Sequence, residues 1–391
     1  MQRMTREAVI VDCARSAFGK RKGALAEVHP TDLLGHVLRT IVERNAVEPD
    51  RYDDVVGGCV TQSGEQGCNV TRNAWVAAGL PWSVPATSVD RQCGSSQQAV
   101  HFVAQGVIAG AYDVAIACGV ESMTRSPMSS NARGGTGPFS RAFLANTDNT
   151  LGIQFWVAQV LADKWGITRE EMDAYALQSH RRAAENTENG FFAGEIVPVP
   201  LPGGGVLDRD EGIRADASLE KIAALPPAWE SAEQPAPDIT AGNSSQMTDG
   251  AAAMIIAERS FAEAHGLPIR ARFRAFAVAA EDPVLVLSAP VPVTYKLMER
   301  TGMSAADWDA VECNEAFASI ALMWQKEFGY PMERFNPRGG AIALGHPLGA
   351  SGVALMTRLL RHLEATGGRY GFQTMCEGGG QANATVIERL P

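Results

Sequence analysis

Two distant segments of the chain repeat the same order of elements, and this repetition limits the possible folds more than any other feature. Residues near 94–119 predict a helix with few charges followed by a strand ending in Cys-Gly, and residues near 350–378 predict a similar helix and a strand ending in Cys-x-Gly. Other strand-like runs alternate with helical patterns around both segments. Such alternation is typical of layered α/β folds. We therefore predict two copies of one α/β layer, related by pattern and not by identity.

The composition of the sequence changes between roughly 121 and 250, where stretches such as "TRSPMSSNARGGTGPFS" are rich in Ser, Gly and Pro. One helix is predicted inside this region, with Thr168 as its N-cap and Glu171 completing a capping box. A long insertion in a packed α/β fold is expected to cover a substrate site. We predict a first α/β half over 1–120, an inserted covering subdomain over 121–250 and a second half over 251–391.

Composition limits the class of partner. The formal net charge of -10 argues against nucleic acid, whereas a small anion needs only a local basic pocket. The seven cysteines form no C-x-x-C pair, so a reducing compartment fits better than a disulfide framework or a zinc ribbon. No apolar run has membrane-spanning length, and neither end carries a recognisable targeting signal. These observations predict a cytoplasmic protein without membrane contact.

The stretch "VDRQCGSSQQAV" places Cys93 where an apolar strand turns into a helix. A thiol at the start of a helix lies against the positive end of the helix dipole, which favours the thiolate. The alternative is a small buried cysteine at a tight turn.

Three further turns carry one reactive or polar group each. "GGAIALGHPLGASG" places His346 in a glycine-packed turn, where a bare backbone suits close approach of a ligand. "MCEGGG" places Cys376 before glycines whose N–H groups can point at an anion, and "CNEAFA" places Asn314 at a strand-to-helix junction. Each turn alone also fits a structural role. His346 could be a capping histidine, the Cys376 segment a hairpin turn, and Asn314 a helix cap.

Taken together, these groups indicate chemistry at strand ends, where α/β folds build their sites. Two thiols, an imidazole, an amide and a cradle of N–H groups are what acyl transfer through a thioester requires. A zinc site built from Cys93, Cys376 and His346 is the competing use, but the sequence lacks short-range chelating pairs.

The stretches "DRQCGSSQQA", "GVESMTRSP", "NEAFA" with "GGAIALGHPLGASG", and "CEGGG" resemble the thiolase family (acetyl-CoA C-acyltransferase type). The similarity covers nearly the whole chain, and "AGNSSQMTDGAAA" (241–253) resembles the family's CoA-binding loop. The resemblance implies the thiolase fold, with two duplicated α/β halves and an inserted covering loop. It also implies no permanently bound cofactor or metal, CoA and acyl-CoA as substrates, and a homodimer or homotetramer formed through the first half.

The resemblance also implies a role for each matched residue. Cys93 would carry the acyl group, and His346 would take the proton of its thiol. Cys376 would be the acid and base at the acetyl carbon. His346 and a water held by Asn314 would stabilise the enolate oxygen, and the N–H groups of Cys93 and Gly378 would form a second oxyanion hole.

The CoA contacts implied by position fall on five residues, namely Arg214, Ala241, Ser245, Ala316 and Phe317. Arg214 suits a phosphate chemically. Its alternative is a surface salt bridge with Glu211 or Asp216, and for Ala316 and Phe317 the alternative is plain helix packing.

Several positions depart from the family pattern. Asp90 stands where Asn is usual, Ser96 where Gly is usual, and Cys313 where an apolar residue is usual. More tellingly, the place of the His-Met-Gly turn of biosynthetic acetoacetyl-CoA thiolases reads "NTLGIQ" (149–154). This difference favours a degradative thiolase that cleaves a 3-ketoacyl-CoA with CoA, similar to bacterial enzymes of fatty acid or sterol breakdown.

Three other functions remain as alternatives. One is a biosynthetic acetoacetyl-CoA thiolase. Another is a non-catalytic CoA-ester or lipid-binding protein, against which the intact set of Cys93, Asn314, His346 and Cys376 counts. The third is a ketoacyl synthase of the same fold, which would use two histidines or a His/Asn pair in place of the second cysteine.

Overall fold

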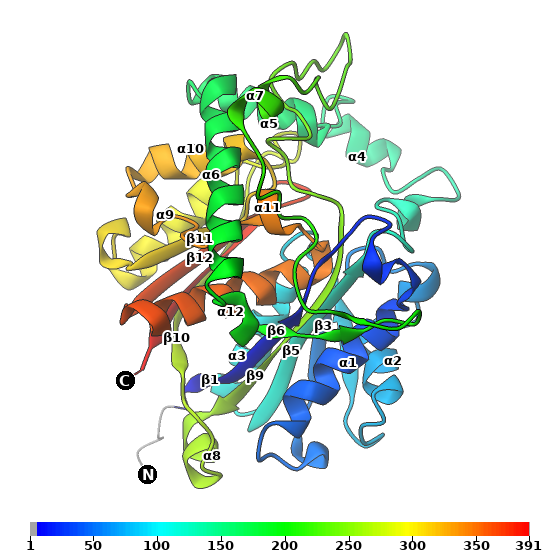
Figure 1. Cartoon of the computed structure of the whole chain (residues 1–391), viewed down its shortest axis with the longest axis vertical. Coiled ribbons are helices and arrows are strands. Elements are labelled where there is room, and N and C mark those ends of the chain that lie inside the picture. The colour runs from blue at the N-terminus through cyan, green and yellow to red at the C-terminus, as the bar shows by residue number, and fades with distance from the viewer. Residues whose placement is uncertain (1–5, 391) are drawn as a thin grey trace.

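The computed structural model describes residues 6–390, and its two α/β halves join in one mixed sheet (Figure 1). The strand order is β11-β12-β13-β10-β1-β9-β5-β3-β4. The strands of the first half are β1 (Ala8–Ser16), β9 (Thr248–Glu258), β5 (Val114–Ser122), β3 (Val55–Gly58) and β4 (Ala86–Val89). Those of the second half are β10 (Ala271–Ala280), β13 (Gln381–Arg389), β12 (Tyr370–Glu377) and β11 (Ala310–Cys313).

The two halves share a pairing pattern when they are followed outward from the β1–β10 contact. In the first half, β1 pairs antiparallel with β9 and β9 with β5, after which β3 runs parallel to β5 and β4. In the second half, β10–β13 and β13–β12 are antiparallel and β12–β11 is parallel. The prediction of two duplicated α/β layers is therefore confirmed.

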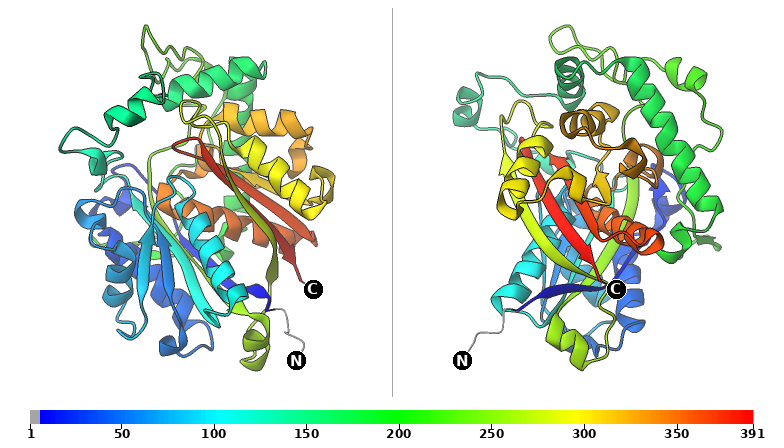
Figure 2. Two further views of the ribbon diagram at one scale, coloured as in Figure 1. Left: turned by 180° about the vertical axis from the view of Figure 1, so that it is seen from behind. Right: turned by 90° about the vertical axis from the view of Figure 1, so that its left-hand side faces the viewer.

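Helices α3 (Ser95–Ala109) and α12 (Leu348–Thr366) occupy the middle of the molecule, between the strands of the two halves (Figures 1 and 2). They pack on each other, and α12 also contacts strands of both halves. A helix buried on most sides cannot carry many charges, which accounts for their apolar sequences. The outer helices are α1 (Pro30–Glu43) and α2 (Val70–Ala77) on the first half, and α9 (Pro290–Thr301) and α10 (Ala318–Phe328) on the second.

Glycines allow α12 to approach the first half closely. A Cβ at Gly119 on β5 would overlap the carbonyl oxygen of Gly349 in the first turn of α12. A Cβ at Gly58 would collide with the same oxygen and with Ser96 N at the start of α3. Larger residues at these positions would push the amino ends of α3 and α12 away from β3 and β5.

The inserted region carries helices that cover one end of the sheet (Figure 2). They are α4 (Arg141–Ala145), α5 (Gln154–Lys164), α6 (Arg169–Glu188) and α7 (Leu219–Ala223). The predicted capping box between Thr168 and Glu171 is present at the start of α6. The predicted division after residue 250 falls inside β9, which lies between β1 and β5 in the sheet of the first half. Among residues 6–390, no helix is long and apolar enough to cross a membrane.

A buried ion cluster ties the inserted region to the first strand. The Arg15 side chain on β1 is fully buried, and its guanidinium donates to Glu195 (2.6 Å) and to both carboxylate oxygens of Asp210 (2.7 and 2.8 Å). Asp210 also accepts from Phe18 N at 2.8 Å. A buried charge is tolerated only when it is paired and hydrogen-bonded, so the three side chains depend on one another.

We therefore predict that Arg15→Met lowers the free energy of unfolding by about 3–5 kcal/mol, because it leaves two buried carboxylates without their cation. Chemical denaturation measures this change. Lys221→Met, which breaks an exposed pair with Asp216, is the control and should change little. Equal effects of the two substitutions would contradict the prediction.

Candidate active site

Cys93 lies in a tight turn between β4 and α3. Gln92 adopts a left-handed conformation (φ 48°), which turns the chain sharply before the cysteine. The turn is held by the Ser95 hydroxyl, which donates to Gln92 O (2.6 Å) and accepts from Arg91 N (2.9 Å). The Cys93 side chain is partly exposed and packs against an apolar cluster of Val60, Met123 and Leu348.

His346 lies in the turn between α11 (Ala341–Leu344) and α12. Gly345 before it has a φ of 106°, and a Cβ there would overlap the Thr248 hydroxyl. His346 N donates to that same hydroxyl (3.0 Å) and to Gln246 O (3.2 Å). The bare backbone noted in the sequence is therefore required by a close approach to β9 and the loop before it.

The hydrogen bonds of His346 define which of its two ring nitrogens carries the proton. Ser351 Oγ donates to Pro347 O (2.9 Å), so at its 2.6 Å contact with His346 Nδ1 it accepts the Nδ1 proton. Nε2 is then unprotonated and accepts from Asn314 Nδ2 at 3.2 Å. Burial lowers the pKa of His346 to about 4, so the ring is neutral at neutral pH and can take a proton at Nε2.

Asn314 follows β11 directly, and its N–H donates to Thr374 O on the neighbouring strand (3.1 Å). Its Oδ1 is buried and has no hydrogen-bond partner among the described residues. A buried polar atom of this kind calls for an explanation, and a hydrogen-bonding ligand or water at the site supplies one.

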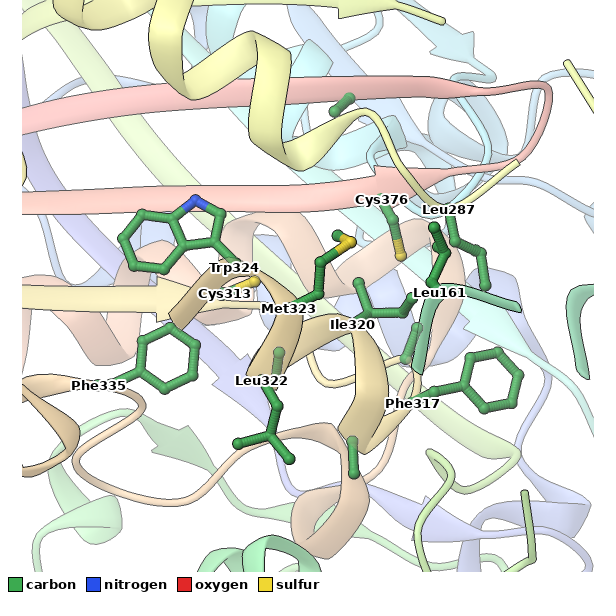
Figure 3. Close-up of a cluster of buried hydrophobic side chains, with 14 of the residues drawn as sticks. Leu161, Leu287, Cys313, Phe317, Ile320, Leu322, Met323, Trp324, Phe335 and Cys376 are labelled. Atoms are coloured by element: carbon green, nitrogen blue, oxygen red, sulfur yellow. The ribbon is translucent and has the colours of Figure 1, made fainter. Parts of the chain in front are cut away.

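Cys376 lies near the end of β12 and is buried among apolar side chains. Figure 3 shows its sulfur pointing into this cluster, between Met323 and Leu287. The cluster also includes Leu161 from α5 and Phe317 from the start of α10. The apolar cluster around the second thiol therefore includes side chains from α5, from the start of α10 and from the loop that contains Leu287.

The glycine turn after Cys376 brings the two cysteine-bearing segments together. A Cβ at Gly378 would lie 3.0 Å from the Gln92 side chain, next to Cys93. Gly379 (φ 80°) and Gly380 (φ 74°) are left-handed, and a Cβ at Gly380 would lie 2.6 Å from Asp282 O. The turn therefore requires glycine for its conformation and for its close contacts.

The thiols of both cysteines are protonated in the free protein. Burial, and after it the charge of Glu377, raises the pKa of Cys93 to about 12. Burial also raises the pKa of Cys376 well above its ordinary value. The two cysteine turns lie close together, since a Cβ at Gly94 would overlap the Glu377 carboxyl. At Cys93 the loss of solvation acts against the thiolate that the helix start favours. Cys93 therefore depends on a base to become a nucleophile.

Two residues that support the site could not be assigned a role from the sequence patterns. Ser351, which orients His346, is a hydroxyl five residues further along, in the first turns of α12. Glu121 ends up fully buried in β5 and accepts from Val60 N, Thr61 N, Gly349 N and Gln66 Nε2. Glu121 lies within "GVESMTRSP", and the sequence signal for its buried role is a single acidic residue in an otherwise apolar strand.

The residues expected to contact CoA lie on three loops that are joined by hydrogen bonds. Ser245 N donates to Ala316 O (2.9 Å), and Gln246 Nε2 donates to Gly212 O (2.8 Å), near Arg214. Phe317 is buried and packs edge-on against Phe155.

Arg214 is exposed and forms neither of the alternative ion pairs among the described residues. Asp216 pairs with Lys221 instead, and Glu211 accepts from Ala24 N (2.9 Å). The Arg214 backbone N–H donates to His180 Nδ1 (3.2 Å) on α6. Its guanidinium is therefore not engaged by these two carboxylates.

The comparisons with known proteins agree with this geometry. The sequence matches the description "Thiolase, N-terminal domain" over residues 8–260 and "Thiolase, C-terminal domain" over 267–389. The chain belongs to the thiolase family. The resemblance drawn from the motifs is confirmed, and thiolases are acyltransferases. The two family domains meet just after β9, which agrees with the sheet order.

Several named thiolases are similar over nearly their full length. The chain is 45% identical to "Steroid 3-ketoacyl-CoA thiolase FadA6" of Mycobacterium tuberculosis, with 98% of this chain and 94% of that protein covered. It is 41% identical to "3-ketoacyl-CoA thiolase" of Aliivibrio salmonicida, with 97% and 99% covered. The crystal structure of the Bacillus anthracis acetyl-CoA acetyltransferase matches with a TM-score of 0.89 and 33% identity over 99% of each chain.

A metal site is not supported within residues 6–390, where no group of three His, Cys, Asp or Glu side chains could hold an ion. Cys93, Cys376 and His346, the three ligands of the competing zinc hypothesis, do not form such a group.

We predict that Ser351→Ala slows acylation of Cys93 in this thiolase by about tenfold to a hundredfold, because His346 loses the acceptor that fixes its proton on Nδ1. Rapid-mixing measurement of CoA release from an acyl-CoA tests this. Thr357→Ala is the control, since that hydroxyl donates to Val353 O within α12. An unchanged acylation rate in Ser351→Ala would show that His346 does not need this contact.

Proposed function

We propose that this thiolase cleaves a 3-ketoacyl-CoA with CoA, giving acetyl-CoA and an acyl-CoA shortened by two carbons. The observation that carries the proposal is that the turns of Cys93 and Cys376 lie against each other, while Leu348, two residues after the oriented His346, packs with Cys93. Acyl transfer to a thiol and proton transfer at carbon need the two thiols to act separately.

In the first step, Cys93 attacks the 3-keto carbon while His346 Nε2 takes its proton. The carbon–carbon bond breaks, and the electron pair forms the enolate of acetyl-CoA. The Cys376 thiol protonates the enolate carbon, which leaves acyl-Cys93 and the Cys376 thiolate. Incoming CoA gives its thiol proton to Cys376 and attacks the acyl carbon, and the leaving Cys93 sulfur regains a proton from His346.

Two sets of donors support the negative oxygens of these steps. We assign His346 and a water held by Asn314 to the enolate oxygen, in agreement with the unpartnered Asn314 Oδ1. We assign the N–H groups of Cys93 and Gly378 to the tetrahedral intermediate at Cys93, in agreement with the closeness of Gly378 to Gln92. Donors held in place before the reaction stabilise such charges most.

We propose that CoA lies along the loops that carry Arg214, Ala241 and Ser245, with Ala316 and Phe317 beside its thiol end. The support is the hydrogen-bonded contact between the 240–247 loop and the segment after β11. The exposed Arg214 guanidinium would meet a phosphate. CoA is then a substrate and no permanently bound cofactor is involved.

We infer a degradative role in fatty acid or sterol breakdown, since the covering loop reads "NTLGIQ" and since Cys376 lies in one apolar cluster with Leu161, Leu287 and Phe317. The printed names of the similar proteins from M. tuberculosis and A. salmonicida support this direction. The alternative of a biosynthetic acetoacetyl-CoA thiolase is not favoured, since the 3-ketoacyl-CoA thiolases are more similar in sequence (45% and 41% identity) than the acetyl-CoA acetyltransferase (33%).

We further propose a homodimer or homotetramer in the cytoplasm. Strand β4 ends the sheet of the described chain, and an unpaired edge is normally covered. Phe102 and Ile108 on α3 nearby are 43% and 46% exposed. The seven free cysteines support a reducing compartment.

The roles of the two thiols are separable. Cys93→Ala should abolish both the acyl adduct and thiolysis, because it removes the nucleophile. Cys376→Ser should still acquire an acetyl group from acetyl-CoA on Cys93, because acylation needs no deprotonation of carbon, but it should not make or break the carbon–carbon bond. Mass spectrometry locates the adduct, and an adduct on Cys376 in the unmodified enzyme would reverse the assignment.

A panel of 3-ketoacyl-CoA substrates tests the degradative role. We expect longer or ring-derived substrates to exceed acetoacetyl-CoA in kcat/KM, because an apolar pocket gains free energy with each buried methylene. A large preference for acetoacetyl-CoA would overturn the degradative role and leave the thiolase reaction standing.

A further inference from the structure

Glu315 directly follows Asn314, yet the reaction described above gives it no task. The residue lies between the end of β11 and the start of α10, and its side chain is buried. Glu312, three residues earlier, pairs with Arg358 (2.6 Å), whereas Glu315 has no ion-pair partner in the described part of the chain. A buried carboxyl group without a cation is tolerated only when hydrogen bonds satisfy it.

Four donors satisfy the Glu315 carboxyl group. Its Oε1 accepts from Tyr175 Oη (2.9 Å) and from Asn336 Nδ2 (3.2 Å). Its Oε2 accepts from Ser179 Oγ (2.7 Å) and from Ile342 N (3.1 Å). Tyr175 and Ser179 lie on α6, and Ile342 lies on α11. One side chain beside the active site therefore joins the covering helix α6 to the segments around α11.

Other contacts fix the direction of these hydrogen bonds. Asn336 Oδ1 accepts from Cys313 N (2.9 Å), and a backbone N–H can only donate, so the amide nitrogen of Asn336 must face Glu315. Ser179 Oγ accepts from Gly340 N (3.0 Å), which leaves its hydroxyl proton for Glu315. Every polar group around the carboxyl group is thus a donor, which is what an ionised carboxyl group requires.

The position of Glu315 connects this network to the reacting groups. Asn314, the residue before it, donates from Nδ2 to His346 Nε2 (3.2 Å), and α11 leads into the turn of His346. His346 is also held separately, by the Thr248 hydroxyl at its backbone N–H and by the Ser351 hydroxyl at Nδ1. Loss of the carboxylate would therefore release Asn314 and leave these two contacts of His346 in place.

We propose that Glu315 is a positioning residue that holds the Asn314 side chain in line with His346 and with the enolate oxygen. The proposal rests on the role proposed above for Asn314. An amide cannot replace the carboxylate, because each carboxylate oxygen receives one N–H that is fixed in direction, from Asn336 on Oε1 and from Ile342 on Oε2. The NH2 group of Glu315→Gln would face one of these two donors and displace the turn after β11.

The test compares two steps in the unmodified enzyme and in Glu315→Gln. Rapid release of CoA from acetyl-CoA measures acylation of Cys93, and kcat for thiolysis of a 3-ketoacyl-CoA includes the step that forms the enolate. We expect thiolysis to slow by about tenfold to a hundredfold, because the enolate loses an aligned donor. Acylation should stay within about twofold, because His346 keeps its own contacts. A result without this selective loss of thiolysis overturns the proposal.

Glu312→Gln is the matched control, because Glu312 is a buried carboxylate on the neighbouring strand β11 whose hydrogen bonds go to Arg358 on α12. We expect it to lower the free energy of unfolding without changing the ratio of the two rates. In a second comparison, Glu315→Gln is added to Asn314→Ala, where no amide is left to position, and should lower kcat by less than about threefold. The same selective loss in Glu312→Gln, or a larger additional loss in the double variant, overturns the proposal.

Should Glu315→Gln fail to fold, Ser179→Ala removes one of the four donors and leaves the carboxylate in place. The same selective loss is then expected at about threefold to tenfold, and its absence overturns the proposal. Amide hydrogen exchange needs no turnover, and it should be faster over 314–318 and 339–345 in the Glu315 or Ser179 variant than in Glu312→Gln. Equal exchange overturns the proposal, whereas failure of the proposed function would appear as absent thiolysis in the unmodified enzyme.

Discussion

The close approach of α12 to β3 and β5 is the contact on which the rest of the site depends. Glycines on both sides remove the side chains that would separate the elements, and Glu121 then spans the contact by accepting from Val60 N and from Gly349 N. The same contact brings Leu348, at the start of α12, against Cys93. Cys93 from the first half and the turn of His346 from the second can come together only because these backbones do.

Loss of solvation governs the chemistry at this contact. It keeps His346 neutral and therefore basic, and it keeps both thiols protonated until a substrate is present. A protonated thiol beside a neutral imidazole is a less reactive resting state than a thiolate and imidazolium pair. In the mechanism that we propose, charge develops only where N–H groups, Asn314 and His346 can stabilise it, which is the usual way in which a preorganised site lowers a barrier.

Much of the fold and the positions of the reacting groups could be predicted from sequence because both depend on local signals. Strand ends, glycine turns and helix caps are read over a few residues, and Cys93, His346, Asn314 and Cys376 all lie at such places. The placement of β9 could not be predicted, because it depends on pairing with β1 and β5, which lie over a hundred residues away along the chain. The same holds for the contact between the Glu377 carboxyl and Gly94, which joins segments far apart in sequence.

The pairing of β5 with β9 has a consequence for how such an enzyme can change. Glu121 lies opposite Gly250 and Ser122 opposite Asp249, so the long inserted region leaves and re-enters the sheet on adjacent antiparallel strands. In topology, the inserted region is a very long connection between the two strands of a β-hairpin. The cost of closing a loop grows only slowly with its length, so residues can be gained, lost or exchanged there while the strand register stays the same. Evolution can therefore alter the inserted region with little effect on the sheet, provided that the contacts of Arg15 with Glu195 and Asp210 are kept.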